Sequence, residues 1–209
     1  MRRWMCACPA LAMLATTARG TPHLDLGPSP VGVTVDARIQ YYDVNAGSLV
    51  ELRRALMTER PRGSGERRWA AVTSWRMVWS YHYVGSITCV IENTQVLVQS
   101  VITFPRWNPT SSPDSALAEW WFQYRAGLAE HERGHAQLAV QAAGSIVGAL
   151  NGMSGRACGA LGQRANTVGG RINIEMEGAQ AEYDLRTRHG ATQIIQATRL
   201  RNPEPNTHP

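Results

Sequence analysis

The sequence predicts an α+β fold in which an antiparallel β-meander and a short helix come first and a pair of long helices follows. β-branched and aromatic residues dominate residues 31–44 and 69–104, with the alternation that strands show. From Trp121 to Ala142, residues of one stripe recur at steps of three and four, as on a helix that covers a core. The length of 209 residues suits one domain with a substantial core.

The N-terminal half supplies the predicted sheet. A first strand is expected over residues 31–44, and Ser48 can cap a short leucine-rich helix after it. Three further strand-like runs follow, over residues 69–83, 86–92 and 95–104. Gly85 and Asn93 separate these runs as turn residues do, so we expect an antiparallel meander.

The C-terminal half is expected to form two long helices. Asp114, or the serine that follows it, can cap the first helix. The second helical stretch covers about residues 157–188, with Gly169-Gly170 as an interruption and Gly190 as its end. Packed as a pair, the second helix would cross the apolar stripe of the first.

Both ends of the chain are expected to lie outside the fold. Residues 1–18 resemble a signal peptide, because two arginines precede an apolar stretch and small residues follow; the alternative is a disordered N-terminus. Residues 19–30 form a spacer rich in proline and glycine, residues 31–200 the domain, and residues 201–209 a loose tail. No later stretch has the apolar length to cross a bilayer, so we predict a secreted or periplasmic protein.

The composition excludes some functions and suggests a disulfide. All 21 basic residues are arginines, so lysine Schiff-base chemistry is excluded. The net charge is +5, but the arginines are scattered, so no nucleic-acid partner is predicted. Two cysteines remain after removal of the leader. In an oxidising compartment this pair, Cys89 and Cys158, predicts a disulfide.

A His-Glu-x-x-His run is the strongest functional signal. On a helix, His131 and His135 stand one turn apart on the same face and Glu132 projects beside them. A single histidine on such a face would more often be a hydrogen-bonded core residue. Two imidazoles and a carboxylate are costly to bury without an ion, whereas Zn²⁺ satisfies all three. The run therefore predicts the zinc site of a hydrolase.

A catalytic zinc ion needs a third protein ligand. His189 is the first choice, because a helix end followed by Gly190 can aim it across the neighbouring helix. Asp184 and Glu182 are the alternatives, since carboxylates also complete such sites. Asp184 could instead hold a ligating imidazole in the correct tautomer.

Other residues of the second helix have weaker signals. Tyr183 is a candidate donor to an oxyanion, with core packing as the alternative. Glu175 and Glu177 are interpreted as solvated charges, with a ligand role open if the helix register differs. The tryptophans are interpreted as core and sheet packing.

Five short motifs occur in a specific order over residues 31–192. They are Tyr41-Tyr42-Asp43-Val44, Thr73-Ser74-Trp75, Pro105-Arg106-Trp107, the run from His131 to His135, and Tyr183-Asp184 with Thr187 and His189-Gly190. Together they resemble a bacterial family, domain of unknown function 922, described as secreted zinc-dependent proteases. The resemblance implies an exported metallopeptidase with a zincin-like domain that acts on peptides or proteins. The glycine and third histidine that follow the run in astacin-like proteases are absent.

The predicted mechanism follows from this site. Zinc lowers the pKa of bound water, and Glu132 takes its proton as the water attacks a peptide carbonyl carbon, then passes the proton to the leaving nitrogen. Two alternatives stay open: a cell-wall amidase with the same site, or a non-catalytic envelope protein with a structural or vestigial zinc site.

Overall fold

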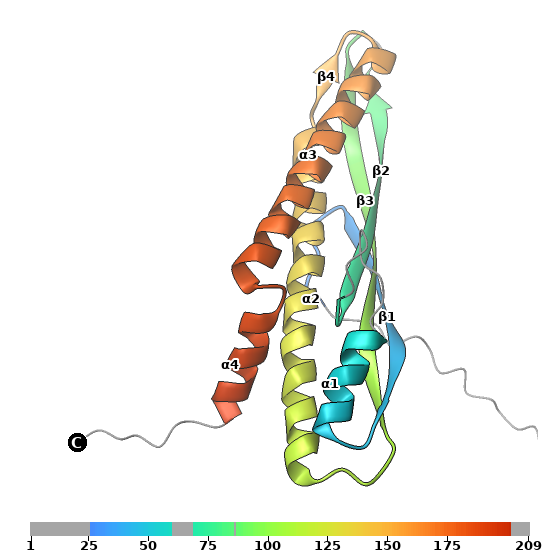
Figure 1. The fold of residues 1–209 in the computed structure, drawn as a ribbon. Coiled ribbons are helices and arrows are strands. Elements are labelled where there is room, and N and C mark those ends of the chain that lie inside the picture. The colour runs from blue at the N-terminus through green and yellow to red at the C-terminus, as the bar shows by residue number, and fades with distance from the viewer. Residues whose placement is uncertain (1–25, 60–68, 86, 202–209) are drawn as a thin grey trace, which may run out of the picture.

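The computed structural model describes residues 26–59, 69–85 and 87–201, and it is α+β as predicted. The elements in chain order are β1 (Val33–Ala46), α1 (Leu49–Thr58), β2 (Val72–Val84), β3 (Cys89–Pro109), α2 (Ser115–Leu150), β4 (Ser154–Gly155), α3 (Cys158–Thr187) and α4 (Ala191–Arg201). Figure 1 shows an elongated molecule in which α2 and α3 cover one side of the sheet and α4 packs against α2. The predicted signal peptide and most of the predicted spacer and tail lie outside the described residues.

The sheet is mixed, so the predicted antiparallel meander is wrong for β1. The strand order is β1-β3-β2, with β1 parallel and β2 antiparallel to β3. After β1, helix α1 leads the chain away from the first strand. β2 then lies two strand positions from β1, and β3 occupies the position between them. β3 is the longest of the strands and is rich in β-branched residues, which suits a central strand paired on both sides. β2 consequently lies at an edge of the sheet.

The predicted turn at Asn93 is also wrong, because residues 89–92 and 95–104 belong to the single strand β3. The pairing of β2 with β3 shifts its register at this point, as a β-bulge does. Asn93 has a φ of 54°, a left-handed conformation that asparagine tolerates. The Thr94 N–H donates a hydrogen bond to Asn151 Oδ1 at 2.9 Å. Asn93 therefore does mark an irregularity of the backbone, but this irregularity is a β-bulge and not a turn.

Two helix starts were predicted correctly. The Ser48 side chain accepts a hydrogen bond from the N–H of Glu51 at the start of α1. The Asp114 carboxylate accepts one from the N–H of Leu117 at 2.7 Å, and α2 then continues for 36 residues. At about 1.5 Å per residue, a helix of this length spans roughly 54 Å and reaches from end to end of the sheet.

α3 is continuous, so the predicted interruption at Gly169-Gly170 is wrong. The missing side chain of Gly169 is used for close packing, since a Cβ there would lie 2.8 Å from the ring of Trp79. The predicted end near Gly190 is confirmed. Arg188 adopts a left-handed φ of 51° and Gly190 a φ of 85°, and α4 starts immediately afterwards.

The main core lies between α2, the start of α3 and the sheet. Its buried members are apolar residues that face one another across this interface, among them Val33, Ile91, Val96, Val98, Ala139, Ile146 and Leu161. The predicted disulfide between Cys89 and Cys158 joins β3 to the first turn of α3, with 5.4 Å between the Cα atoms. Within the described ranges, no helix combines the length and apolar character needed to cross a bilayer.

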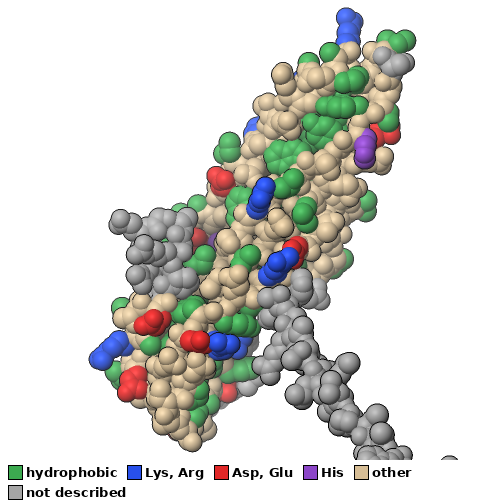
Figure 2. Space-filling model, turned by 90° about the vertical axis from the view of Figure 1, so that its right-hand side faces the viewer, with side chains coloured by type: hydrophobic (Ala, Val, Ile, Leu, Met, Phe, Trp, Pro, Cys, Tyr) green, Lys and Arg blue, Asp and Glu red, His purple; other side chains and the backbone are tan. Residues whose placement is uncertain are grey.

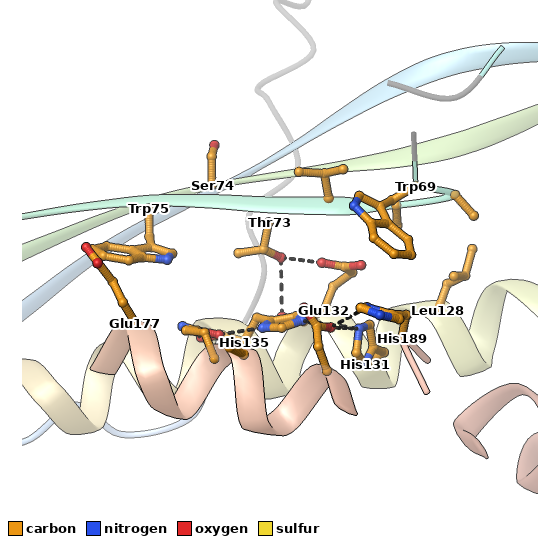
Figure 3. Close-up of a pocket in the computed structure, with 16 residues that line it drawn as sticks. Trp69, Thr73, Ser74, Trp75, Leu128, His131, Glu132, His135, Glu177 and His189 are labelled. Carbon is orange, nitrogen blue, oxygen red and sulfur yellow. Dashed lines mark hydrogen bonds and ion pairs between the residues drawn. The ribbon is translucent and has the colours of Figure 1, made fainter. Parts of the chain in front are cut away.

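The outer face of the sheet carries few charged side chains, and these are scattered among polar and apolar ones (Figure 2). The side chains of the His-Glu-x-x-His run lie on the opposite side of the sheet, between the sheet and the helices (Figure 3). The inner face is therefore where the candidate site is found.

We expect Gly127→Ala to destabilise the protein, because α2 and α4 approach closely there. A Cβ at Gly127 would lie 2.5 Å from the Cα of Ile194, so the backbones must separate. The free energy of unfolding should fall by about 1–3 kcal/mol. Gly178→Ala on α3 is the matched control: no atom lies within 4 Å of its Cβ position, so this variant should gain about 0.5–1 kcal/mol. Urea denaturation measures both changes, and equal effects would contradict the packing argument.

Candidate metal centre

α2 places the two motif histidines on its inner side, as predicted. His131 is 4% exposed and the His135 side chain 13% exposed. Their rings are nearly perpendicular, with 4.6 Å between centroids, and their Nε2 atoms lie 3.1 Å apart. Two ring nitrogens therefore point at the same small volume.

α3 adds a carboxylate to this volume. Asp184 Oδ1 lies 3.2 Å from His131 Nε2 and 3.1 Å from His135 Nε2. The three atoms form a nearly equilateral triangle, and these three residues form a group that could bind a metal ion. Ligands bound tetrahedrally to zinc at roughly 2.0–2.1 Å lie about 3.3 Å from each other. The spacing of the donor atoms fits such an ion.

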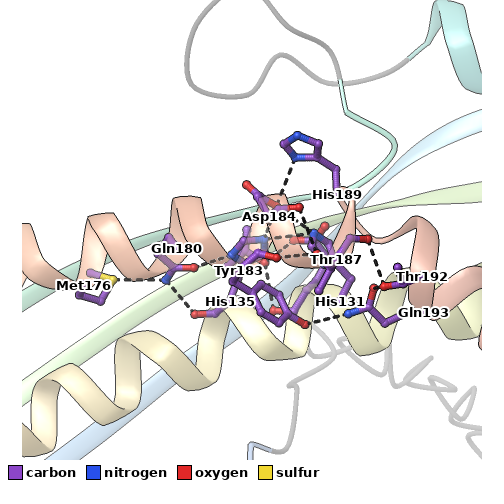
Figure 4. A network of polar contacts seen from close by, with 12 residues as sticks. His131, His135, Met176, Gln180, Tyr183, Asp184, Thr187, His189, Thr192 and Gln193 are labelled. Carbon is purple, nitrogen blue, oxygen red and sulfur yellow. Dashed lines mark hydrogen bonds and ion pairs between the residues drawn. The ribbon is translucent and has the colours of Figure 1, made fainter.

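Hydrogen bonds fix the orientation of both imidazoles (Figure 4). Gln180 donates its amide N–H to the carbonyl oxygen of His135 at 3.0 Å, which leaves its Oε1 to accept from His135 Nδ1. Thr187 donates its hydroxyl to the carbonyl oxygen of Tyr183 at 2.7 Å, so it accepts from His131 Nδ1 at 3.3 Å. With both protons on Nδ1, both Nε2 lone pairs face the carboxylate.

Glu132 lies beside this group on the side of the sheet. It is 3% exposed, and Thr73 of β2 donates its hydroxyl to Glu132 Oε2 at 2.7 Å. Burial raises the pKa of the Glu132 carboxyl, and the Thr73 hydrogen bond opposes this shift. A general base works best when its pKa approaches the working pH. The environment of Glu132 moves its pKa in that direction.

Burial also controls the charge of His131. Desolvation lowers the pKa of this imidazole to about 4, and the neighbouring His135 acts in the same direction. Asp184 opposes the shift by favouring the protonated form. His131 is therefore neutral at physiological pH, which is the form that binds a metal.

His189, the first choice for a third ligand, lies next to Asp184. Its Nδ1 is 3.3 Å from Asp184 Oδ1, and its ring stacks on Trp69 with 4.1 Å between centroids. Figure 4 shows the contact between His189 and Asp184, with the motif imidazoles of α2 below it. Gly190 packs on His131, because a Cβ there would lie 3.1 Å from the ring. The ligand role of His189 stays a prediction, and the geometry favours the alternative that the sequence also offered, Asp184.

The other two candidates are not members of the metal-binding group. Glu182 is exposed and does not line the pocket described below. Tyr183 stacks on His131 with ring planes 10° apart, and its hydroxyl accepts a hydrogen bond from Gln193 at 3.2 Å. A Cβ at Gly134 would overlap this hydroxyl. These contacts support the packing role of Tyr183, and its role as an oxyanion donor stays a prediction.

A pocket of about 660 Å³ opens over the group, between β2 and the helices α2 and α3 (Figure 3). One wall consists of the seven consecutive residues 69–75, which lead into β2 and form its first part. Sequence reasoning gave no function to Trp69, Trp75, Thr73 or Gln180. A signal existed for Thr73 and Trp75, which belong to one of the ordered motifs, but Gln180 had none.

Comparison with protein families gave a match over residues 39–190 to a model described as "Bacterial protein of unknown function (DUF922)". This range includes the three residues of the metal-binding group, the residues that orient them, and the wall of the pocket. Comparison with curated proteins and with solved structures gave no match.

We expect the burial of His131 to destabilise the metal-free protein as the pH falls from 7 toward 4.5, and the raised pKa of Glu132 to oppose this change. The unfolded chain binds a proton at His131 near pH 6.5, whereas the folded chain does so only near pH 4. Between these values the unfolded state binds more protons, so acid favours it by about 2–3 kcal/mol. His131→Gln should remove most of this pH dependence, as measured by urea denaturation across the range.

The control for this measurement is His82→Gln, which removes an exposed histidine on β2. It should retain the pH dependence of the wild-type protein. If the His131 and His82 variants behave alike, burial of His131 is not the cause of the acid sensitivity.

Proposed function

The chain belongs to the DUF922 family of bacterial proteins of unknown function, and from its site we propose that it is an exported zinc-dependent peptidase. His131, His135 and Asp184 would hold the ion, and Glu132 would act as the general base. One observation carries the proposal: three donor atoms lie 3.1–3.2 Å apart, with both Nδ1 protons of the imidazoles engaged elsewhere.

The donor set suits a hydrolytic metal. Two imidazoles and one carboxylate bind zinc in catalytic sites and leave a fourth position open. The same set also binds Fe²⁺ in oxygenases. A buried carboxylate beside the group favours hydrolysis, because hydrolysis requires a base and Glu132 is already placed there.

The protein's own residues then have separate tasks. A bound zinc ion would supply a Lewis acid that polarises a carbonyl and makes water more acidic. Glu132 takes a proton from the attacking water and transfers it to the leaving nitrogen. Thr73 holds one carboxylate oxygen of Glu132 in place. Gln180 and Thr187 keep the imidazoles oriented.

Asp184 is the preferred third ligand because it contacts both motif imidazoles, whereas His189 contacts Asp184. The volume of the pocket, about 660 Å³, lies in the range of ligand-binding pockets, roughly 300–1,000 Å³. The disulfide supports export, since such bonds persist in oxidising compartments.

The choice of ligand predicts a difference between two variants. Asp184→Ala should weaken zinc binding by about 100-fold or more, because it removes a ligand. His189→Ala should retain one zinc ion per chain with an affinity within about tenfold of wild type. Metal analysis and competition with a chromogenic chelator measure both, and iron is quantified in the same samples. The reverse order of affinities would restore His189 as the ligand.

If Glu132 is the general base, its removal should abolish cleavage without abolishing zinc binding. Glu132→Gln should still bind zinc but lose about 100-fold or more of the rate of cleavage, measured with casein and with peptidoglycan peptides. Glu130→Gln, an exposed carboxylate on the same helix, is the matched control and should stay active.

Three outcomes would change this proposal. Retained cleavage by Glu132→Gln would remove Glu132 from the mechanism. Cleavage confined to peptidoglycan peptides would favour the amidase alternative. Zinc binding by the wild-type protein without turnover of either substrate would favour a structural site.

A further inference from the structure

The pocket extends beyond the metal-binding group to a second aromatic residue and a further carboxylate. Trp69 and His189 lie at one end of the pocket in Figure 3, and Trp75 of β2 and Glu177 of α3 lie at the other. The Glu177 side chain reaches from α3 toward the ring of Trp75, so that a carboxylate and an indole face the same space. Neither belongs to the metal-binding group.

The charge of this end differs from the charge of the whole chain. The chain has a net charge of +5 and 21 arginines, but the described residues that line the pocket include three carboxylates and no arginine. Two of these carboxylates have partners within the site: Thr73 for Glu132, and the imidazoles for Asp184. Glu177 accepts a hydrogen bond from the neutral Asn173 side chain at 3.3 Å, and no ion pair to Glu177 is found among the residues that the structure describes.

The shape of the wall points to an extended chain as the ligand. β2 is an edge strand in the order β1-β3-β2, and residues 69–75 line the pocket without a gap. An extended polypeptide can pair with such an edge through its backbone, and alternate side chains then enter pockets. Thr73 contacts Glu132, and Trp75 is the next residue on the same face of β2, about 6–7 Å along the strand.

Resting on the proposed function, we infer that Trp75 and Glu177 form a subsite for a cationic side chain, arginine or lysine, within two residues of the bond that is cleaved. The face of an indole attracts a cation through the negative charge of its π-system, and a carboxylate next to it adds an ion pair. A neutral side chain would gain only the contact with Trp75. An acidic side chain would be repelled by Glu177.

The first test reads cleavage. A mixture of peptides from a digested proteome is incubated with the zinc-loaded protein, and the new ends are identified by mass spectrometry. Arginine and lysine should be enriched about tenfold over glutamate and aspartate at one position within two residues of the cut. Glu177→Gln should reduce this enrichment severalfold, and Glu177→Arg should reverse it.

The matched control is Glu175→Gln. Glu175 is an exposed carboxylate of the same helix that pairs with Arg171 at 3.6 Å and does not line the pocket. This variant removes the same charge from α3, so it should keep the wild-type preference. An equal loss of preference in both variants would mean that the general field of the helix, not the subsite, selects the substrate.

The second test reads binding without turnover. Fluorescently labelled, end-blocked peptides that differ only in a central arginine, glutamine or glutamate are titrated into zinc-loaded Glu132→Gln protein. The arginine peptide should bind about tenfold more tightly than the glutamate peptide. Adding Glu177→Arg should reverse the order, and circular dichroism verifies that each variant is folded.

The two tests separate failure of the subsite from failure of the enzyme. Cleavage without a preference for basic residues would overturn the subsite and leave the peptidase intact. Charge-selective binding without any cleavage would overturn the peptidase and support the subsite. Peptides that do not bind, or that bind with equal affinity whatever the residue at position 177, would also overturn the subsite.

Discussion

The carboxylate of Asp184 faces two imidazoles whose other nitrogens are already engaged, and the site depends on this contact between α2 and α3. Three atoms with lone pairs lie 3.1–3.2 Å apart, and such an arrangement needs a positive charge at its centre. A proton cannot easily supply it, because burial holds the pKa of His131 at about 4. A metal ion can supply it, and neutral His131 is in the form that binds one.

The surrounding fold leaves room for this contact at two glycines. Gly134 has no side chain where the hydroxyl of Tyr183 packs, and Gly190 has none where His131 packs. Tyr183 covers the imidazoles and Gln193 holds its hydroxyl, so the side of the group away from the pocket is closed. The open side faces β2. An approaching ligand therefore meets the group from the direction of the edge strand.

The parts of the structure that depend on neighbouring residues were predictable from the sequence. The caps at Ser48 and Asp114, the helix with its inward histidines, and the cysteine pair were all predicted correctly. The order of the strands was not, because pairing of β1 with β3 joins segments more than 60 residues apart. For the same reason, helical periodicity could not show which of Asp184, Glu182 and His189 is the third ligand. Nor could it identify Gln180 as a partner of His135. Those choices depend on the register of α3 against α2, which packing determines.

The position of the disulfide has a consequence for how α3 is held. Cys158 fastens the first turn of α3 to the sheet, whereas Asp184 lies near its last turn, about 40 Å farther along the helix. In the proposed holo-protein the helix would thus have a permanent covalent attachment at one end and a reversible ionic one at the other. Loss of the ion would loosen only the end of α3 that lines the pocket. Scarcity of zinc would then reduce the proposed peptidase activity, while the disulfide kept the start of α3 attached to the sheet.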